Sequence, residues 1–142
     1  MQIEPIAFVR NRVREPRPHG WERDESTIEL RPDLAATTEG LERYSHVTVV
    51  TWLHLVPAAE QRRRLKMAEW VPEQGILATR SQLRPNPIGV TVCELRKVDG
   101  ARLTVRGLDA VDGTPVLDIR PYIPFYDSLP DARVPEWARP PG

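Results

Sequence analysis

The sequence predicts an all-β domain, a small barrel-like fold with few short helices. Short runs of β-branched and aromatic residues recur along the chain, and turn residues separate them. The chain has 142 residues and 15 prolines, and a proline inside a helix removes a backbone donor and clashes with the preceding turn. Apolar and mixed positions alternate most clearly over residues 46–56. The odd positions from Val47 to Leu55 form a nearly pure apolar face, and the even positions from His46 to His54 form a mixed face.

The first half of the chain supplies strands and an irregular loop. Residues 3–9 predict a first strand, in which Pro5 indicates an edge position. Residues 11–24 hold prolines and a glycine among arginines, which predicts a polar loop. A short strand, a helical turn and the clearest strand are then expected over 26–30, 38–44 and 46–56.

The second half continues the pattern after one ambiguous segment. Residues 58–69 fit a short amphipathic helix or a charged strand edge, and we favour the helix. Asp112-Gly113 predicts a type I′ hairpin turn, because both residues tolerate positive φ. Further strands are expected over 76–79, 88–98, 102–106 and 115–120.

The composition limits the partners. With 20 basic and 20 acidic residues the net charge is zero, which excludes a histone-like coat for nucleic acid. Lys66 and Lys97 are the only lysines, so the other 18 basic residues are arginines, which favour bidentate contacts to carboxylate or phosphate.

We expect one domain over 1–142, with its core at about 3–130 and an extended tail over 131–142. No signal peptide or membrane span is expected, so the predicted location is the cytoplasm.

Several kinds of chemistry are excluded or left open. No two glycines form a Gly-x-Gly motif, which excludes a Rossmann fingerprint and a P-loop. Cys93 is the only cysteine and lies among valines, so we expect a core residue. His46 and His54 would lie about 26 Å apart on one strand, so no metal site is expected. His54 either ends its strand as a polar residue or binds a ligand or transfers a proton.

The segment from Gly75 to Gly89 is the most unusual. Pro85 and Pro87 fix their own φ and keep the preceding residues out of the helical region. The loop therefore presents the arginines 80 and 84 and the amide of Asn86 on a stiff backbone. It is either a preorganised binding site or a proline-stiffened turn with solvated arginines.

Several uncommon motifs follow one another in a fixed order along the chain. They are Tyr44-Ser45-His46, Ala78-Thr79-Arg80-Ser81, Arg84-Pro85-Asn86-Pro87-Ile88-Gly89, Asp109-x-x-Asp112-Gly113-Thr114-Pro115-Val116-Leu117-Asp118-Ile119, Pro121-Tyr122-Ile123-Pro124 and Asp127-Ser128-Leu129-Pro130. In this order they resemble the TrmO (YaeB, VirR-like) family of tRNA methyltransferases, and the resemblance runs from about Ile3 to Pro130. Residues 57–74 depart from the basic, proline-rich loop of the family.

The resemblance implies a single-sheeted β-barrel that dimerises and binds S-adenosylmethionine in a crevice near the subunit contact. The implied activity is methylation of N6 of threonylcarbamoyladenosine next to the anticodon of tRNA. Arg80 or Arg17 suits the cofactor carboxylate, and Asp112 suits a cationic or hydroxyl group. The implied cofactor contacts are Pro16, Arg17, Pro18, His54, Leu55, Arg80, Val90, Asp112, Gly113, Thr114 and Pro115.

Two residues are candidates for removing the acceptor proton, His54 and Asp109. Arg84 and Asn86 are predicted to bind substrate, and replacing the arginines at 62–64 with alanine is expected to weaken RNA binding. Two alternatives stay open. The same scaffold would methylate a small molecule or peptide, or a dimer would bind S-adenosylmethionine without catalysis.

Overall fold

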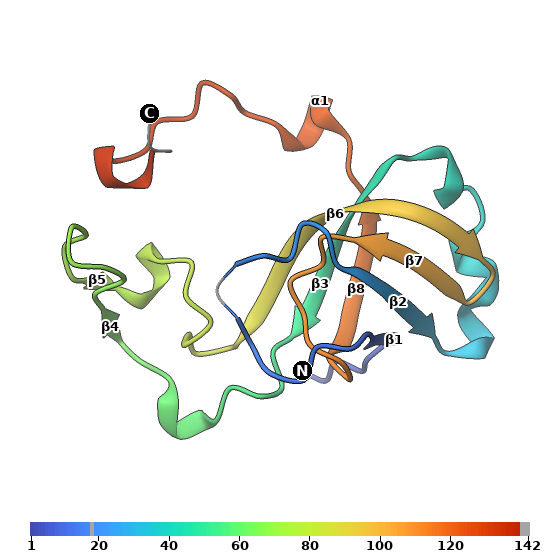
Figure 1. Cartoon of the computed structure of the whole chain (residues 1–142), viewed down its shortest axis with the longest axis horizontal. Coiled ribbons are helices and arrows are strands. Elements are labelled where there is room, and N and C mark those ends of the chain that lie inside the picture. Colours follow the sequence, from blue (N-terminus) through green and yellow to red (C-terminus); the bar gives the residue numbers. More distant parts are fainter. Residues whose placement is uncertain (18, 140–142) are drawn as a thin grey trace.

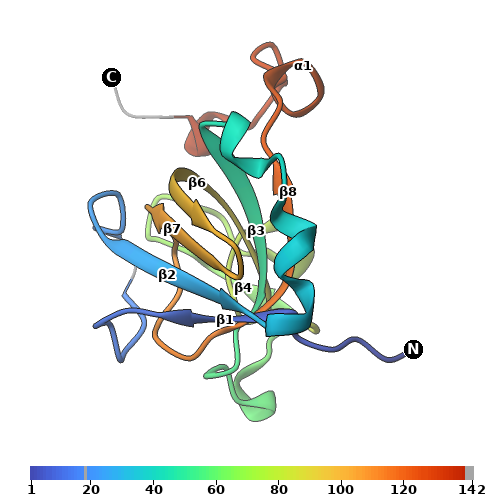
Figure 2. The same cartoon turned by 90° about the vertical axis from the view of Figure 1, so that its right-hand side faces the viewer.

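A closed barrel of six antiparallel strands forms the body of the molecule (Figures 1 and 2). The computed structural model describes residues 1–17 and 19–139. Around the barrel the strands follow the order β1, β2, β7, β6, β3, β8. Their bounds are β1 Ala7–Arg10, β2 Glu25–Leu30, β3 His46–Trp52, β6 Ile88–Asp99, β7 Arg102–Arg106 and β8 Pro115–Pro121. The prediction of an all-β barrel is confirmed.

The barrel interior is filled by the alternate side chains of its strands. Val47, Val49 and Thr51 of β3 are buried, as the alternation predicted. The apolar cluster also takes in Cys93 of β6, which confirms its expected place in the core. Burial raises the pKa of the Cys93 thiol to about 12, so the group stays protonated and inert at neutral pH. The other members include Val9, Ile28, Leu103, Val105, Leu108 and Val116.

The first strand is shorter than expected. It begins at Ala7, beyond Pro5, and pairs with β2 on one side and β8 on the other. The edge position indicated by Pro5 is therefore wrong, because closure of the barrel leaves β1 without a free edge. The irregular loop over 11–24 is confirmed for the described residues. The helical turn expected over 38–44 is the 3-10 helix η2 Leu41–Arg43, and a second 3-10 helix, η1 Pro32–Thr38, precedes it and overlaps the expected range only at Thr38.

Two local predictions fail between β3 and β6. The favoured helix over 58–69 is replaced by a 3-10 turn, η3 Ala58–Glu60, and the two-residue strand β4 Arg64–Leu65. β4 pairs with β5 Gln74–Gly75, so a second, two-stranded sheet lies beside the barrel and the fold is not single-sheeted. The strand expected over 76–79 is the 3-10 helix η4 Ile76–Ala78, whose Ile76 is buried as an anchor.

The turn at Asp112-Gly113 exists but joins no hairpin. β7 pairs with β2 and β6, whereas β8 pairs with β1 and β3, so the segment between them crosses one end of the barrel. The amide of Thr114 donates to the carbonyl of Val111 at 3.2 Å, and of the four residues in this turn only Gly113 has positive φ, at 83°. This is the pattern of a type II turn, so the type I′ prediction is wrong.

The segment after β8 leaves the barrel (Figures 1 and 2). It contains one short helix, α1 Pro124–Asp127, and a 3-10 turn, η5 Glu136–Ala138. Beyond Tyr122, whose amide donates to the carbonyl of His46, the described backbone hydrogen bonds of this segment are local. No helix within residues 1–17 and 19–139 is long and apolar enough to cross a membrane.

Candidate functional site

A cleft lies at the end of the barrel where β3 finishes. Its volume is about 40 Å³. The wall combines an apolar surface with one imidazole and one carboxylate. It comes from Pro16 and Trp21 of the loop over 11–24, from the segments 53–56 and 109–114, and from the segment Gly75–Gly89, which we call the proline-braced loop. The lining residues are Pro16, Trp21, Leu53, His54, Leu55, Val56, Gln82, Asp109, Ala110, Val111 and Thr114.

The cleft brings together both predicted proton acceptors. His54 follows the end of β3, and Asp109 lies on the segment that crosses the barrel end. A methyl group built on Gly113 would lie 4.0 Å from Nε2 of His54, so the imidazole stands against the Asp112-Gly113 turn. Partial burial raises the pKa of the Asp109 carboxyl, and the positive charge of Arg17 opposes that shift.

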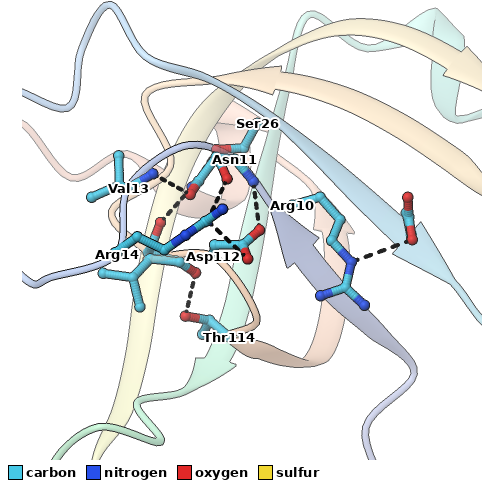
Figure 3. A network of polar contacts seen from close by, with 10 residues as sticks. Arg10, Asn11, Val13, Arg14, Ser26, Asp112 and Thr114 are labelled. Atoms are coloured by element: carbon cyan, nitrogen blue, oxygen red, sulfur yellow. Dashed lines mark hydrogen bonds and ion pairs between the residues drawn. The ribbon is translucent and has the colours of Figure 1, made fainter.

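Hydrogen bonds centred on Asn11 join the first loop to this turn (Figure 3). The Asn11 side-chain amide donates to Oγ of Ser26 at 3.0 Å and to the carbonyl of Ala110 at 2.8 Å. Its oxygen accepts from the amide of Val13 at 2.9 Å. All three side-chain bonds lie in a part-buried setting, so Asn11 fixes where the loop leaves β1.

Asp112 holds the other side of the same connection (Figure 3). Its Oδ1 accepts from the backbone amide of Asn11 at 2.9 Å, and its Oδ2 lies 3.0 Å from Nη1 of Arg14. The amide of Asp112 in turn donates to the carbonyl of Val13 at 2.7 Å. Both carboxylate oxygens therefore position the loop, and a ligand contact for Asp112 stays a prediction.

Arg17 is held in place by contacts within the first loop. Its guanidinium pairs with Asp24 and lies 4.5 Å from the ring centroid of Trp21. The indole Nε1 of Trp21 donates to the carbonyl of Arg17 at 3.0 Å, so the two side chains lock each other in place. Pro18, another predicted cofactor contact, lies outside the described residues.

The remaining predicted residues divide into two groups. Pro16, Leu55 and Thr114 line the cleft with His54, and Pro115 begins β8 immediately beyond it. The others are absent from the cleft wall. They are Arg80 on the proline-braced loop, Val90 on the outer face of β6, and the predicted substrate residues Arg84 and Asn86.

Arg84 braces the loop that carries it. Its Nη1 donates to the carbonyls of Thr79 and Ser81, both at 3.0 Å. The guanidinium is thus used in the backbone geometry of the loop, and its role toward substrate stays a prediction. Asn86 is exposed, and its carbonyl accepts from the amide of Ile88 at 2.7 Å.

Six lining residues are absent from the sequence-based site. Most are apolar neighbours of predicted residues along the chain, such as Ala110 and Val111 beside Asp109. Trp21 had one available signal, as the only aromatic residue in an arginine-rich loop. The six are Trp21, Leu53, Val56, Gln82, Ala110 and Val111.

A larger hollow lies near the other end of β3. Its volume is about 570 Å³, and its wall comes from η1, η2 and β8 with Leu30 and Ile6. None of the predicted site residues that the structure describes lines it. Within residues 1–17 and 19–139, no group of His, Cys, Asp and Glu side chains is arranged to hold a metal ion.

The comparisons with known proteins bear directly on this barrel and its motifs. The tRNA-methyltransferase O N-terminal domain family matches the chain over residues 8–128. The chain belongs to this TrmO family. The crystal structure of TrmO from Pseudomonas aeruginosa superposes with a TM-score of 0.74 at 36% sequence identity, covering 94% of this chain and 60% of that one. The resemblance stated from the motifs is confirmed.

Two curated proteins are similar to this chain over different shares of their own length. The S-adenosyl-L-methionine-binding protein of Archaeoglobus fulgidus is 34% identical over 91% of this chain and 94% of its own length. The tRNA (adenine(37)-N6)-methyltransferase of Escherichia coli K12 is 41% identical over 69% of this chain. The match covers 44% of the length of that enzyme, so this chain corresponds to less than half of it.

Proposed function

We propose that this chain is an S-adenosylmethionine-dependent methyltransferase that modifies N6 of an adenine next to the anticodon of tRNA. The proposed acceptor is threonylcarbamoyladenosine, and the proposed place of action is the cytoplasm, where such RNA is used. One observation carries the proposal. Six of the predicted site residues, Pro16, His54, Leu55, Asp109, Thr114 and the adjacent Gly113, gather at one barrel end in a TrmO-family fold.

The residues present fit the proposed cofactor. The wall offers an apolar surface from Leu53, Leu55 and Val56, which suits an adenine ring. Arg80 on the neighbouring loop supplies an exposed cation for the cofactor carboxylate. Bound S-adenosylmethionine would supply a methyl group already activated by a sulfonium.

The task left to the protein is alignment and proton removal. Because the methyl group is activated, most of the rate gain comes from holding the acceptor nitrogen in line with it. The acceptor N6–H must give up one proton as nitrogen becomes methylated. His54 and Asp109 face the cleft, and we assign one of them to accept that proton. Asp109 is the better matched, because partial burial raises its pKa and makes the carboxylate a stronger base.

We also propose that the working unit is a homodimer. The cleft of one protomer, at about 40 Å³, is far smaller than the roughly 300–1,000 Å³ of small-molecule sites. On the outer face of the barrel, Val90 and Val92 of β6 are 57% and 48% exposed, and Val50 of β3 pairs with Val90. A second copy covering this apolar face would enlarge the cleft and give Val90 a role in it.

A methyl-transfer assay tests the proposed function. The protein is incubated with S-adenosylmethionine labelled in its methyl group and with tRNA that carries threonylcarbamoyladenosine. Label is expected on N6 of that nucleoside by mass spectrometry, and the rate should fall in His54→Ala or Asp109→Asn. Unmodified tRNA is the matched control for the acceptor. Absence of label from a protein that binds the cofactor would contradict RNA methylation.

A second function is favoured by one comparison. The Archaeoglobus relative that matches this chain over nearly its whole length is named only as an S-adenosyl-L-methionine-binding protein. A dimer that binds the cofactor without transferring methyl would show saturable binding and no product on tRNA. A small molecule or peptide acceptor would instead show turnover in its presence while tRNA gives none.

A further inference from the structure

Residues 58–86 form an arm that projects from the barrel (Figure 1). The strands β4 and β5 build its two-stranded sheet, with Arg64 opposite Gly75 and Leu65 opposite Gln74. The chain reverses through a turn in which the amide of Val71 donates to the carbonyl of Ala68 at 3.0 Å. In Figure 1 the arm and the 3-10 helices η1 and η2 lie on opposite sides of the barrel.

The arm concentrates positive charge in a chain whose net charge is zero. It contains six basic and three acidic residues, so it carries +3 and the remainder of the chain carries −3. A charge separation of this kind attracts a polyanion to one side of a protein. The basic residues are Arg62, Arg63, Arg64, Lys66, Arg80 and Arg84, and the acidic residues are Glu60, Glu69 and Glu73.

Ion pairs leave three of these cations available. Arg64 lies 3.3 Å from Glu73, and Lys66 lies 3.8 Å from Glu69. Arg84 is engaged with backbone carbonyls. Among residues 1–17 and 19–139, no carboxylate lies within 4.0 Å of the guanidinium nitrogens of the remaining arginines, at positions 62, 63 and 80, and all three residues are exposed.

An aromatic side chain stands at the tip of the arm. Trp70 occupies the third position of the Ala68–Val71 turn and is 76% exposed. The indole is not packed into the fold, so its faces are open to a ligand. Nucleic-acid bases stack on exposed aromatic rings in single-stranded regions, and neighbouring arginines hold the phosphates.

The base of the arm is attached to the cleft wall. The amide of Arg62 donates to the carbonyl of Leu83 at 2.8 Å, and the preceding residue, Gln82, lines the cleft. The amide of Ile76 donates to the carbonyl of Arg63 at 2.8 Å, and Ile76 is buried. An RNA loop bound along Arg62 and Arg63 would therefore lie beside the opening of the cleft.

We infer that the arm is an RNA-binding surface, in which Arg62 and Arg63 contact phosphates and Trp70 stacks on an unpaired base of the anticodon loop. The inference rests on the proposed function for the identity of the RNA, and it adds the surface and the mode of contact. Unpaired loop bases suit it because their faces are accessible, whereas the faces of paired bases are covered by their stacked neighbours in an RNA helix.

Fluorescence anisotropy with a labelled anticodon stem-loop RNA tests the inference. Arg62→Ala/Arg63→Ala should lower the affinity several-fold and reduce the slope of log affinity against log salt by about 1.5, as two lost phosphate contacts require. Trp70→Ala should lower the affinity by about 5- to 100-fold with the slope unchanged, and Trp70→Phe should restore most of it. Arg96→Ala/Arg102→Ala removes equal charge from the barrel and should leave binding nearly unchanged.

Thermal melting and sedimentation of each variant complete the test. Wild-type affinity and salt slope in both arm variants, while the wild-type protein methylates tRNA, would overturn the inference and leave the proposed function standing. A change of oligomeric state in Trp70→Ala would make the tip a protein contact and also overturn it. If the wild-type protein binds cofactor and RNA but transfers no methyl, the proposed function fails and the arm is still assessed by affinity.

Discussion

Asn11 links the two chain segments on which the cleft depends. Its side chain makes three hydrogen bonds, to Ser26, Ala110 and Val13. Asn11 is not among the residues that line the cleft, yet its hydrogen bonds decide where Pro16 and the Asp112 turn stand relative to each other. A change at Asn11 is therefore expected to affect cofactor binding as well as the stability of the fold.

Replacing Asn11 with alanine should therefore have two measurable effects. Loss of the amide leaves part-buried partners unsatisfied, so the free energy of unfolding should fall by about 1–3 kcal/mol in urea titrations. Affinity for S-adenosylmethionine should fall as well, because the first loop is released. Asn86→Ala removes an exposed amide that makes no side-chain hydrogen bond to the part of the chain that the structure describes, and it is the matched control for stability. Unchanged cofactor affinity in Asn11→Ala would contradict the positioning role.

Asp109 should give the reaction a pH dependence. Its folded-state pKa is raised, chiefly by burial, so its contribution to stability is present at low pH and is lost as pH rises through that pKa. A base must be deprotonated, so kcat should rise over the same range and then level off. Asp109→Asn should lower kcat and remove this acidic limb from the pH–rate profile, without loss of stability at neutral pH. An acidic limb that persists in the variant would assign the proton to another group.

At the scale of elements, the close approach of β3 and β6 depends on Gly89. A β-carbon on Gly89 would lie 2.6 Å from Oγ1 of Thr51 and 3.1 Å from Cδ2 of Leu53. Gly89→Ala should therefore destabilise the barrel by about 1–3 kcal/mol through overpacking. Gly75 of β5 has φ of −59° and no atom within 4 Å of its added β-carbon. Gly75→Ala should change stability by less than about 0.5 kcal/mol in the same urea titration, and equal effects would contradict this account.

The elements that sequence reasoning found are those with a strong local pattern. β7 is Arg102–Arg106, as predicted, and β3 was recognised by its alternation, although it ends at Trp52. The arm was missed because β4 and β5 have two residues each, too few for alternation, and their pairing joins distant positions. The Asp112-Gly113 turn was located, but the two strands that it joins do not pair with each other. Their pairing partners are set by closure of the barrel, which a dipeptide motif does not predict.

The site was predictable only in part, and mainly through the family motifs. The resemblance implied a cofactor contact for His54 and Thr114, and Asp109 begins one of its motifs; the structure brings all three into one cleft. Trp21 and Gln82 were missed because each comes from a loop without periodicity, and only the folded chain brings them to the same wall.

At the scale of the whole molecule, the exposed apolar face of β3 and β6 predicts self-association. Val92→Asp would place a charge on that face, so the sedimentation mass should fall from dimer to monomer. Cofactor affinity should fall with it if a second copy completes the cleft. Ile3→Asp introduces the same charge at another exposed apolar residue outside the barrel strands and serves as the control. A wild-type protein that sediments as a monomer and binds the cofactor tightly would contradict the shared site.

The most direct test of the cleft is calorimetric titration of S-adenosylmethionine into three proteins. These are the wild type, Leu55→Trp, which places a large side chain on the cleft wall, and Leu77→Trp, which makes the same change on the exposed arm. We predict saturable binding to the wild type and to Leu77→Trp, and an affinity at least about tenfold lower for Leu55→Trp. No binding to the wild type, or equal affinity in all three proteins, would contradict the assignment of this cleft to the methyl donor.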